Sequence, residues 1–285
     1  MSRQVVVATA LDLDPARDRD RLEAAAEALG GGLEEREGHG RIHLERPAPP
    51  ARLEAAGREL GLDLNPLPEG FDPRRVGLVL SDMDSTLVAA ETIDEIADLA
   101  GLKPQVAAIT EAAMRGELDF AEALRRRVAL LRGLEAEALE RVWAEGRLPP
   151  SPGAEALAAG LRARGIRSAV VSGGFDCFTS RLARRLGLDA HRANRLGVRE
   201  GRLTGELEGP VVDARAKVAF LEELCGRWGL RPEQVVAVGD GANDLPMLRR
   251  AGLGVAWRAK PVLREAAAVR LDRSGLDTLL AFLEP

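Results

Sequence analysis

Residues 76–87 read VGLVLSDMDSTL, an apolar run that ends in two aspartates two positions apart. A short apolar run without polar interruption is typical of a strand that is buried on both faces of a parallel sheet. Side chains at positions i and i+2 of an extended chain point the same way. The carboxylates of Asp82 and Asp84 are therefore expected to face one ligand at the carboxyl end of this strand.

Two further apolar runs are followed by polar clusters. Residues 168–171 precede the tripeptide SGG at 172–174, and residues 235–238 precede the hexapeptide GDGAND at 239–244. From residue 152 onward, short apolar runs alternate with helical patterns, which predicts an α/β fold with a parallel sheet covered on both faces. Ligands bind such sheets at the carboxyl ends of the strands, so all three clusters are expected at one edge.

Four aspartates in these clusters predict a magnesium site: Asp82, Asp84, Asp240 and Asp244. Close carboxylates repel one another unless a cation lies between them or one of them is protonated. Mg²⁺ prefers oxygen ligands and binds through one or two carboxylates together with a substrate phosphate. The alternative is that Asp84 and Asp240 only cap the helices that follow them, but four carboxylates at two strand ends favour the cation.

Ser172, Gly173 and Lys217 predict a site for an anion. Glycines let backbone N–H groups approach an anion closely, and a serine hydroxyl or a helix N-terminus supplies further attraction. Lys217 is one of only three lysines among 40 basic residues, and it lies early in a predicted helix over 214–228, where a cation opposes the helix dipole. An ordinary turn and a solvated lysine are the alternatives. Together with the aspartates, these residues indicate phosphoryl transfer to a carboxylate.

Two other parts of the chain carry patterns of their own. Residues 1–70 predict the order β-α-β-β-α, with a candidate last strand near 62–64 and a linker over 64–70, which is a split βαβ pattern. Only helices are predicted between the first buried strand and residue 149, which indicates an inserted helical subdomain. These helices are expected over 92–99, 103–114, 120–131 and 135–143.

The net charge, the apolar runs and the cysteine positions argue against several classes of protein. The 285 residues carry a net charge of −5, whereas a protein that binds nucleic acid is usually basic. No uncharged apolar run approaches the roughly 18 residues that span a bilayer, and the N-terminus lacks the pattern of a signal peptide. Cys177 and Cys225 lie in no CxxC pair, so free thiols are expected. We therefore expect a cytoplasmic protein with no nucleic-acid or membrane partner.

Taken together, the motifs resemble those of the haloacid dehalogenase (HAD) superfamily. Residues 82–87 are similar to its first motif, DxDxT/V. Residues 172–174, Lys217 and residues 239–244 are similar to its second, third and fourth motifs, in the same order. The resemblance covers about residues 76–272 and implies a small phosphorylated molecule as substrate.

Within this superfamily, the chain looks most like the bacterial phosphoserine phosphatases. The similar stretches are residues 91–97 and 116–131, which lie in the predicted helical insert. The resemblance implies a HAD-type Rossmann-like parallel sheet in a phosphatase domain at 76–285, with a helical-bundle cap inserted at about 90–148. In element order, residues 1–70 resemble the ACT-like α+β domain found ahead of some of these enzymes, which implies a regulatory role or a homodimer.

The resemblance also implies a role for each residue of the motifs. Asp82 would be the nucleophile that forms an aspartyl-phosphate, and Asp84 the general acid and then the general base. Mg²⁺ would be held by the Asp82 carboxylate, the Asp84 backbone carbonyl and Asp240, with Asp244 behind them. The residues that would hold the phosphate are Ser172, Gly173, Lys217 and Asn243.

The helical insert would select the substrate. Glu91 would face the ammonium group of phosphoserine and Arg127 would bind its carboxylate through two bonds, while Phe120 and Met114 would pack over the site. The alternatives are a helix-start carboxylate at Glu91, a solvated arginine at Arg127 and ordinary core side chains. The implied reaction is hydrolysis of O-phospho-L-serine to L-serine and phosphate, the final step of serine biosynthesis. A phosphatase or phosphotransferase for another small phosphomonoester, such as homoserine phosphate, is the alternative.

Overall fold

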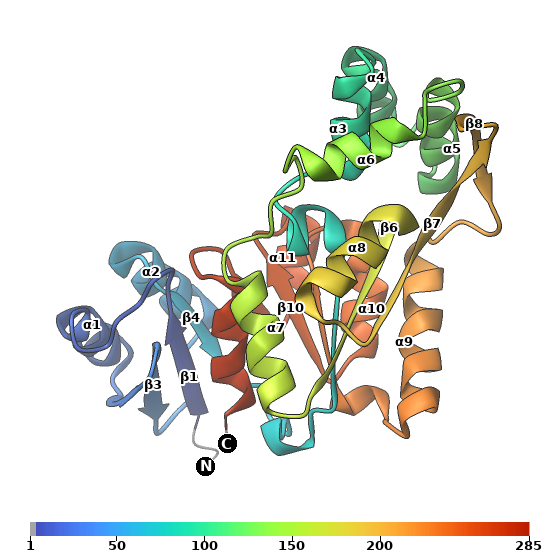
Figure 1. The fold of residues 1–285 in the computed structure, drawn as a ribbon. Coiled ribbons are helices and arrows are strands. Elements are labelled where there is room, and N and C mark those ends of the chain that lie inside the picture. Colours follow the sequence, from blue (N-terminus) through green and yellow to red (C-terminus); the bar gives the residue numbers. More distant parts are fainter. Residues whose placement is uncertain (1–3, 285) are drawn as a thin grey trace.

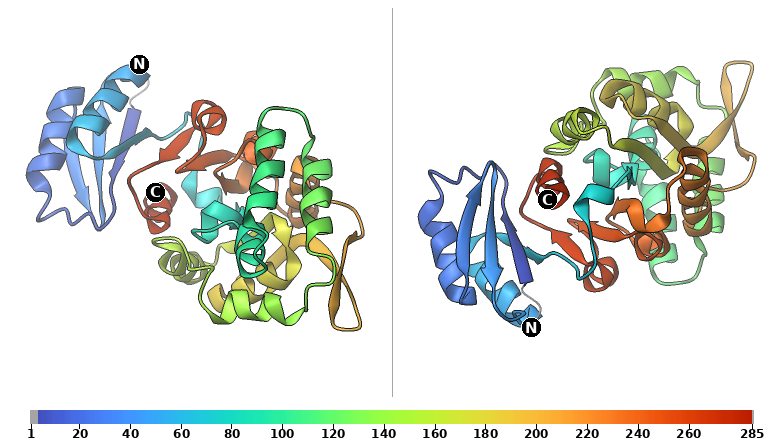
Figure 2. Two further views of the ribbon diagram at one scale, coloured as in Figure 1. Left: turned by 90° about the horizontal axis from the view of Figure 1, so that it is seen from above. Right: turned by 90° about the horizontal axis from the view of Figure 1, so that it is seen from below.

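The computed structural model describes residues 4–284, apart from the side chain of Met114, and contains two β-sheets (Figure 1). The smaller sheet is formed by the N-terminal part of the chain and lies beside the larger one (Figure 2). Within the described residues, no helix combines the length and the apolar character needed to cross a membrane.

The N-terminal sheet is built from β1 (Gln4–Thr9), α1 (Arg19–Leu29), β2 (Gly32–Arg36), β3 (His39–Leu44), α2 (Pro50–Leu60) and β4 (Asp63–Pro66). Its strands pair antiparallel in the order β2-β3-β1-β4, which is the split βαβ arrangement expected from the sequence. Leu22, Ala25 and Leu29 recur at helical spacing on α1 and are buried in the core of this unit. The last strand continues to Pro66, so the first residues of the expected linker are strand.

The larger sheet contains β5 (Leu78–Ser81), β6 (Arg167–Phe175), β7 (Ala190–Arg199), β8 (Arg202–Glu208), β9 (Val235–Gly239), β10 (Leu253–Trp257) and β11 (Val269–Leu271). The strand order is β11-β10-β9-β5-β6-β7-β8, and all pairs are parallel except the β7–β8 hairpin. The strand that precedes Asp82 therefore lies at the centre of the sheet, with a neighbour on either side. This confirms the α/β fold with a parallel sheet.

Helices cover both faces of this sheet. Along β5, Val79 belongs to one buried cluster while Leu78 and Leu80 belong to the other, as expected for a strand with two buried faces. One face is covered by α7 (Ala154–Ala163), α8 (Asp176–Leu186) and a 3₁₀ segment (Leu276–Leu283). The other face is covered by α9 (Ala214–Trp228), α10 (Leu245–Arg250) and α11 (Pro261–Ala266).

Three local features of the structure are not as the sequence predicts. The strand expected over 168–171 runs on to Phe175, so residues 172–174 form the end of β6 and do not follow it. Neither α11 nor the segment 276–283 is expected from the sequence. Each is short, and so few turns give no usable helical period.

Four helices stand over the carboxyl ends of the strands (Figure 1): α3 (Thr92–Leu99), α4 (Lys103–Met114), α5 (Phe120–Leu130) and α6 (Glu137–Ala144). Their bounds agree with those expected from the sequence to within two residues at each end. The chain leaves the sheet through a tight turn at Met83–Leu87, and an isolated bridge between Val88 and Pro150 joins the two ends of the insertion. This helical insertion closes over the edge where the motif residues gather.

Polar contacts join the N-terminal sheet to the last strand of the larger one. The Asn65 amide donates to the backbone oxygen of Arg270 and accepts from its backbone N–H, both at 2.8 Å. The Asp63 carboxylate accepts a hydrogen bond of 2.6 Å from the Ser274 hydroxyl. Burial raises the pKa of Asp63, and the hydrogen bond from Ser274 opposes that rise. The two sheets are thus held together by paired polar groups.

Candidate active site

Asp82 follows β5 directly and lies at the middle of the sheet edge. It is buried, and its backbone N–H continues the pairing with β9 by donating to the Val238 oxygen at 2.9 Å. One carboxylate oxygen accepts from the Met83 N–H at 2.7 Å, and the other lies 2.8 Å from Lys217 Nζ. The carboxylate is therefore fixed in orientation by the turn that begins at Met83 and by a cation.

Lys217 supplies that cation from the first turns of α9. Its side chain is fully buried, and its ammonium lies 2.6 Å from Asp244 as well as 2.8 Å from Asp82. Burial disfavours the charged amine, but the two carboxylates outweigh this effect and raise the pKa of Lys217. The alternative that Lys217 is a solvated surface lysine is therefore wrong, because its ammonium is enclosed between the carboxylates of Asp82 and Asp244.

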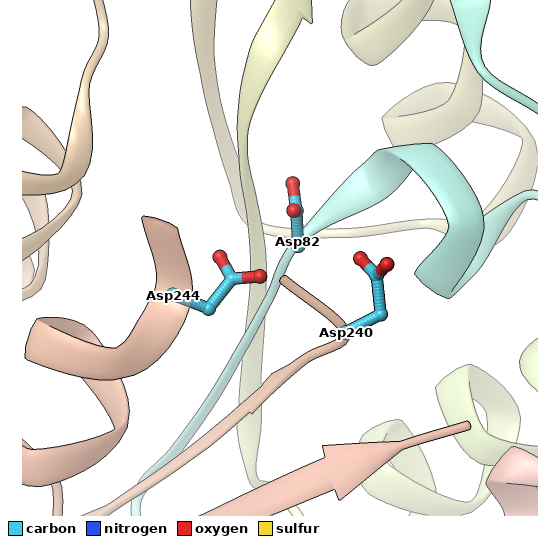
Figure 3. Close-up of side chains that lie close together, drawn as sticks. All are labelled: Asp82, Asp240 and Asp244. Carbon is cyan, nitrogen blue, oxygen red and sulfur yellow. The ribbon is translucent and has the colours of Figure 1, made fainter. Parts of the chain in front are cut away.

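Three carboxylates converge at this point from different elements (Figure 3). Asp82, Asp240 and Asp244 each offer an oxygen, and these atoms lie within 4.8 Å of one another. Asp244 is held in place by the Gly241 N–H at 3.1 Å, and the Thr86 hydroxyl donates to Asp240 at 3.3 Å. The expected place of Asp244 behind the metal ligands stays a prediction; its carboxylate lies close to those of Asp82 and Asp240 and is held by Lys217 at 2.6 Å.

The charge of this cluster suits a divalent cation. Three buried carboxylates face one buried ammonium, which leaves an excess of negative charge in the cluster. Burial and the Asp244 carboxylate raise the pKa of Asp240 to about 6, and the same two effects raise the pKa of Asp82 well above its usual range. An oxygen-rich site with two surplus negative charges fits Mg²⁺, which prefers carboxylate ligands.

The Asp84 side chain is turned away from this cluster. Its two oxygens accept hydrogen bonds from the Thr92 N–H at 2.9 Å and from the Ser172 hydroxyl at 2.8 Å. Burial and the nearby Glu91 carboxylate raise the pKa of Asp84 to about 7. A carboxyl group with this pKa can hold or release a proton near neutrality, which is what a general acid and base requires.

A strained turn links Asp84 to the helical insertion. Ser85 adopts a left-handed conformation with φ of 54°, which is uncommon for a residue other than glycine. Its hydroxyl donates to Glu91 Oε1 at 2.8 Å. The turn thereby carries the chain from the sheet edge into α3 and sets Glu91 beside Asp84.

A cavity of about 890 Å³ lies between the strand ends and the helical insertion. Its floor contains the aspartates and the glycine segment of β6, and its walls come from α3, α4 and α5. Phe120 packs over Gly173 so closely that a Cβ atom there would lie 2.7 Å from the ring, so a larger residue would displace the ring. The predicted site residues that line this cavity are Asp82, Asp84, Glu91, Phe120, Arg127, Gly173, Asp240 and Asn243.

Arg127 is separated from its charged neighbours on α5. Arg125 and Arg126 are exposed, and Arg126 pairs with Glu122, whereas Arg127 is half-buried at the wall of the cavity. Burial lowers the pKa of Arg127, and the Glu91 and Asp94 carboxylates act against this change. The interpretation of Arg127 as part of a solvated run is therefore wrong.

Three predicted residues with described side chains, Ser172, Lys217 and Asp244, do not line the cavity and are fully buried. The Ser172 hydroxyl is engaged with Asp84 as described above. The side chain of Met114 lies outside the described residues, so its expected place over the site stays a prediction.

Sequence reasoning missed other residues of the site. Asp94 and Lys260 line the cavity, and the Lys260 N–H donates to the Asp240 backbone oxygen at 2.9 Å. The signal for Asp94 is its spacing, because it follows Glu91 by three positions and therefore lies on the same side of α3. Lys260 is one of the three lysines in the chain but belongs to no recognised motif.

The comparisons with known proteins agree with this geometry. Residues 79–249 match the family model of the haloacid dehalogenase-like hydrolases. The chain is 46% identical over 233 residues to a phosphoserine phosphatase of Archaeoglobus fulgidus, with 82% of this chain and 67% of that one covered. It is 49% identical over 213 residues to a phosphoserine phosphatase of Albidiferax ferrireducens, with 73% of this chain and 90% of that one covered.

A solved structure extends the likeness to almost the whole chain. The crystal structure of a probable phosphoserine phosphatase from Vibrio cholerae superposes with a TM-score of 0.83 at 36% identity, covering 98% of this chain and 86% of that one. The resemblance inferred from the four motifs is confirmed, since sequence and structure lead to the same relatives. The chain belongs to the haloacid dehalogenase-like hydrolases.

Proposed function

We propose that the protein is a phosphoserine phosphatase, which hydrolyses O-phospho-L-serine to L-serine and phosphate. One observation carries the proposal: Asp82, held by the Lys217 ammonium, and Asp84, whose pKa lies at about 7, line the floor of a cavity whose wall presents Glu91 and Arg127. With its phosphate at the floor, phosphoserine would place its ammonium near the Glu91 carboxylate and its carboxylate near the Arg127 guanidinium. The names of the relatives described above support the same activity.

The reaction proceeds in two steps. The Asp82 carboxylate attacks phosphorus, the bond to the serine oxygen breaks, and the leaving oxygen takes the proton from the Asp84 carboxyl group. Water then attacks the phosphorus of the aspartyl-phosphate while Asp84 takes a proton from it. The bond to Asp82 breaks, and phosphate leaves.

The neighbouring residues prepare these steps. Lys217 favours the ionised form of Asp82 and aims it, because its ammonium holds one carboxylate oxygen at 2.8 Å. Asp84 can both give and take a proton because its pKa lies at about 7. Ser172, Gly173 and Asn243 would bind the phosphoryl oxygens around the attack line.

Mg²⁺ would be held by the carboxylates of Asp82 and Asp240 and by the backbone carbonyl of Asp84, with Asp244 bound to Lys217 beside them. When bound, the ion neutralises negative charge on the phosphoryl oxygens and on the carboxylates around it. The surplus negative charge of the acidic cluster supports a divalent ion at this place.

Substrate choice would rest on the helical insertion at about residues 90–148, acting as a cap over the site. Glu91 would bind the substrate ammonium, Arg127 its carboxylate, and Phe120 would exclude water above the phosphate. Met114 is proposed to complete the same wall. Because the cavity mouth lies between the cap and the sheet, a movement of the cap would admit substrate and release product.

We propose residues 1–70 as an ACT-like regulatory or dimerisation domain beside a phosphatase domain at 76–285. The βαββαβ order of its elements supports this proposal. Sedimentation of the full chain measures its mass in solution, and a monomer at all concentrations would contradict the dimer. We further propose that the enzyme acts in the cytoplasm.

The test of the function is phosphate release from L-phosphoserine, phosphothreonine, homoserine phosphate and a generic aryl phosphate, each with Mg²⁺ and with chelator. We expect a strong, Mg²⁺-dependent preference for phosphoserine. Activity on the aryl phosphate alone would keep the chemistry of Asp82 but refute the substrate. Release that depends on a second alcohol would indicate a phosphotransferase.

A further inference from the structure

The buried side chain of Asn194 connects the end of β6 to the segment that precedes α9. It lies on β7 and is 2% exposed. Its amide nitrogen donates to the backbone oxygens of Gly173 at 2.8 Å and Gly174 at 3.3 Å. Its amide oxygen accepts from the Val212 N–H at 2.7 Å. Both ends of the amide are thus used, and none of the motifs includes this residue.

The pairing of β6 with β7 explains why an amide is needed here. The two strands are in regular register up to Val171, which is opposite Arg192, and pairing resumes with Phe175 opposite Asn194. Three residues of β6, at 172–174, therefore lie opposite a single residue of β7, at 193, and the segment 172–174 bulges from the ladder. The carbonyls of the bulge lose their strand partner, and Asn194 replaces it from its side chain.

The hydrogen bond from Asn194 affects the site through the orientation of the peptide group between Gly173 and Gly174. In a trans peptide the C=O and the N–H point in opposite directions. When Asn194 holds the Gly173 oxygen on one side, the Gly174 N–H is presented on the other, where it donates to Ser172 Oγ at 2.7 Å. The Ser172 hydroxyl in turn donates to Asp84 at 2.8 Å.

The bond from Val212 reaches a second motif. Val212 immediately precedes Asp213, whose carboxylate accepts from the Ala216 N–H at 2.9 Å and begins α9. Lys217 lies in the first turns of that helix and holds Asp82. Asn194 therefore fixes the glycine segment of β6 relative to the start of the helix that carries Lys217.

We propose that Asn194 is a positioning residue, which sets the segment 172–174 and the start of α9 at the spacing that binds the phosphoryl group. The inference rests on the proposed phosphatase chemistry but not on phosphoserine as the substrate, since the segment is proposed to bind the phosphoryl group. A misplacement of this segment should weaken binding of any phosphate and slow the transfer step.

The test compares Asn194→Asp with a matched variant. Aspartate has the shape of asparagine, but it presents a carboxylate oxygen, which accepts hydrogen bonds and donates none, to the backbone oxygens of Gly173 and Gly174. The Val212 N–H still has a side-chain oxygen as its acceptor. Asn65→Asp is the control, because Asn65 is also a buried asparagine that bonds backbone groups, but it lies at the junction of the two sheets. Both variants are measured with the full chain and Mg²⁺, using the aryl phosphate for kinetics and inorganic phosphate for binding by calorimetry.

We expect Asn194→Asp to lower kcat about 10- to 100-fold and to weaken phosphate binding about tenfold, in line with the cost of misplaced groups. The control variant should lower the melting temperature without either change. Wild-type values of kcat and phosphate affinity in Asn194→Asp would overturn the inference, as would equal losses in the control.

Two further outcomes can be told apart from a failure of the inference: a variant that does not fold, and a substrate that is not phosphoserine. If Asn194→Asp does not fold, Asn194→Ser, which keeps one donor and one acceptor, should fold and show the same losses on a smaller scale; wild-type behaviour in this variant would refute the inference. If the wild type cleaves the aryl phosphate but not phosphoserine, the proposed function fails while the role of Asn194 is still measured. A wild type that binds no phosphate would refute both.

Discussion

Replacing Arg127 with alanine tests how the enzyme recognises a substrate carboxylate. The guanidinium is half-buried at the cavity wall, and its Nε donates to the Ala123 oxygen at 3.3 Å. Among the described residues no acid lies within ion-pair distance of its two terminal nitrogens, so both are available to a substrate. A bidentate bond of this kind contributes about 1.5–3 kcal/mol. Because 1.36 kcal/mol is a factor of ten, Arg127→Ala should lower kcat/KM for phosphoserine about 10- to 150-fold.

The assay compares two substrates and two arginines. An aryl phosphate has no carboxylate, so its kcat/KM should change less than threefold in Arg127→Ala. Arg126→Ala is the control, because Arg126 is one position away, is exposed and pairs only with Glu122. Equal losses for both substrates would show that Arg127 supports the fold of the insertion. An unchanged kcat/KM for phosphoserine would remove the residue from the site.

Three other changes test the centre of the site. Asp82→Asn should abolish turnover in steady-state assays while the circular dichroism spectrum stays that of the wild type; measurable turnover would assign the nucleophile elsewhere. Lys217→Arg should lower kcat by at least tenfold, because a planar guanidinium does not fit the space of an ammonium held between Asp82 and Asp244, and wild-type kcat would show that charge alone suffices. In chelator, the protein should lose stability as pH rises through about 6, because burial raises the pKa of Asp240 and the folded state then holds more protons than the unfolded state. Mg²⁺ should remove this loss in melting experiments across pH, and a melting temperature that rises with pH in chelator would contradict the assigned sign.

The residues of the site could be predicted from the sequence more completely than the end of β6 or the short helices. Asp82, Asp240 and the segment 172–174 could be brought together without a structure, because the carboxyl ends of parallel strands share one edge of a sheet. Their convergence needed only three buried strands, each recognisable from an apolar run. The cation between Asp82 and Asp244 could not be foreseen, because spacing along the chain does not reveal which acids enclose a lysine.

Other features depend on packing that a single sequence does not display. The extension of β6 to Phe175 depends on an amide from β7 that replaces lost strand pairing. Arg127 could not be told from its two neighbours in the sequence, since only the direction of α5 decides which of three arginines enters the cavity. Short elements such as α11 were missed because six residues contain fewer than two helical turns.

Lysine and arginine pair with acids in different ways in this chain. Two of the three lysines in the chain lie here, with Lys217 enclosed between two carboxylates and Lys260 at the cavity wall beside Asp240. An ammonium is a compact charge that fits between two acids, whereas the planar guanidinium presents several donors to acids placed around its plane. Arg147 is such a case, since it pairs with three carboxylates at the surface of the insertion. Of the three lysines, Lys217 alone is buried, so its enclosure between two acids, rather than the scarcity of lysine, marks this site.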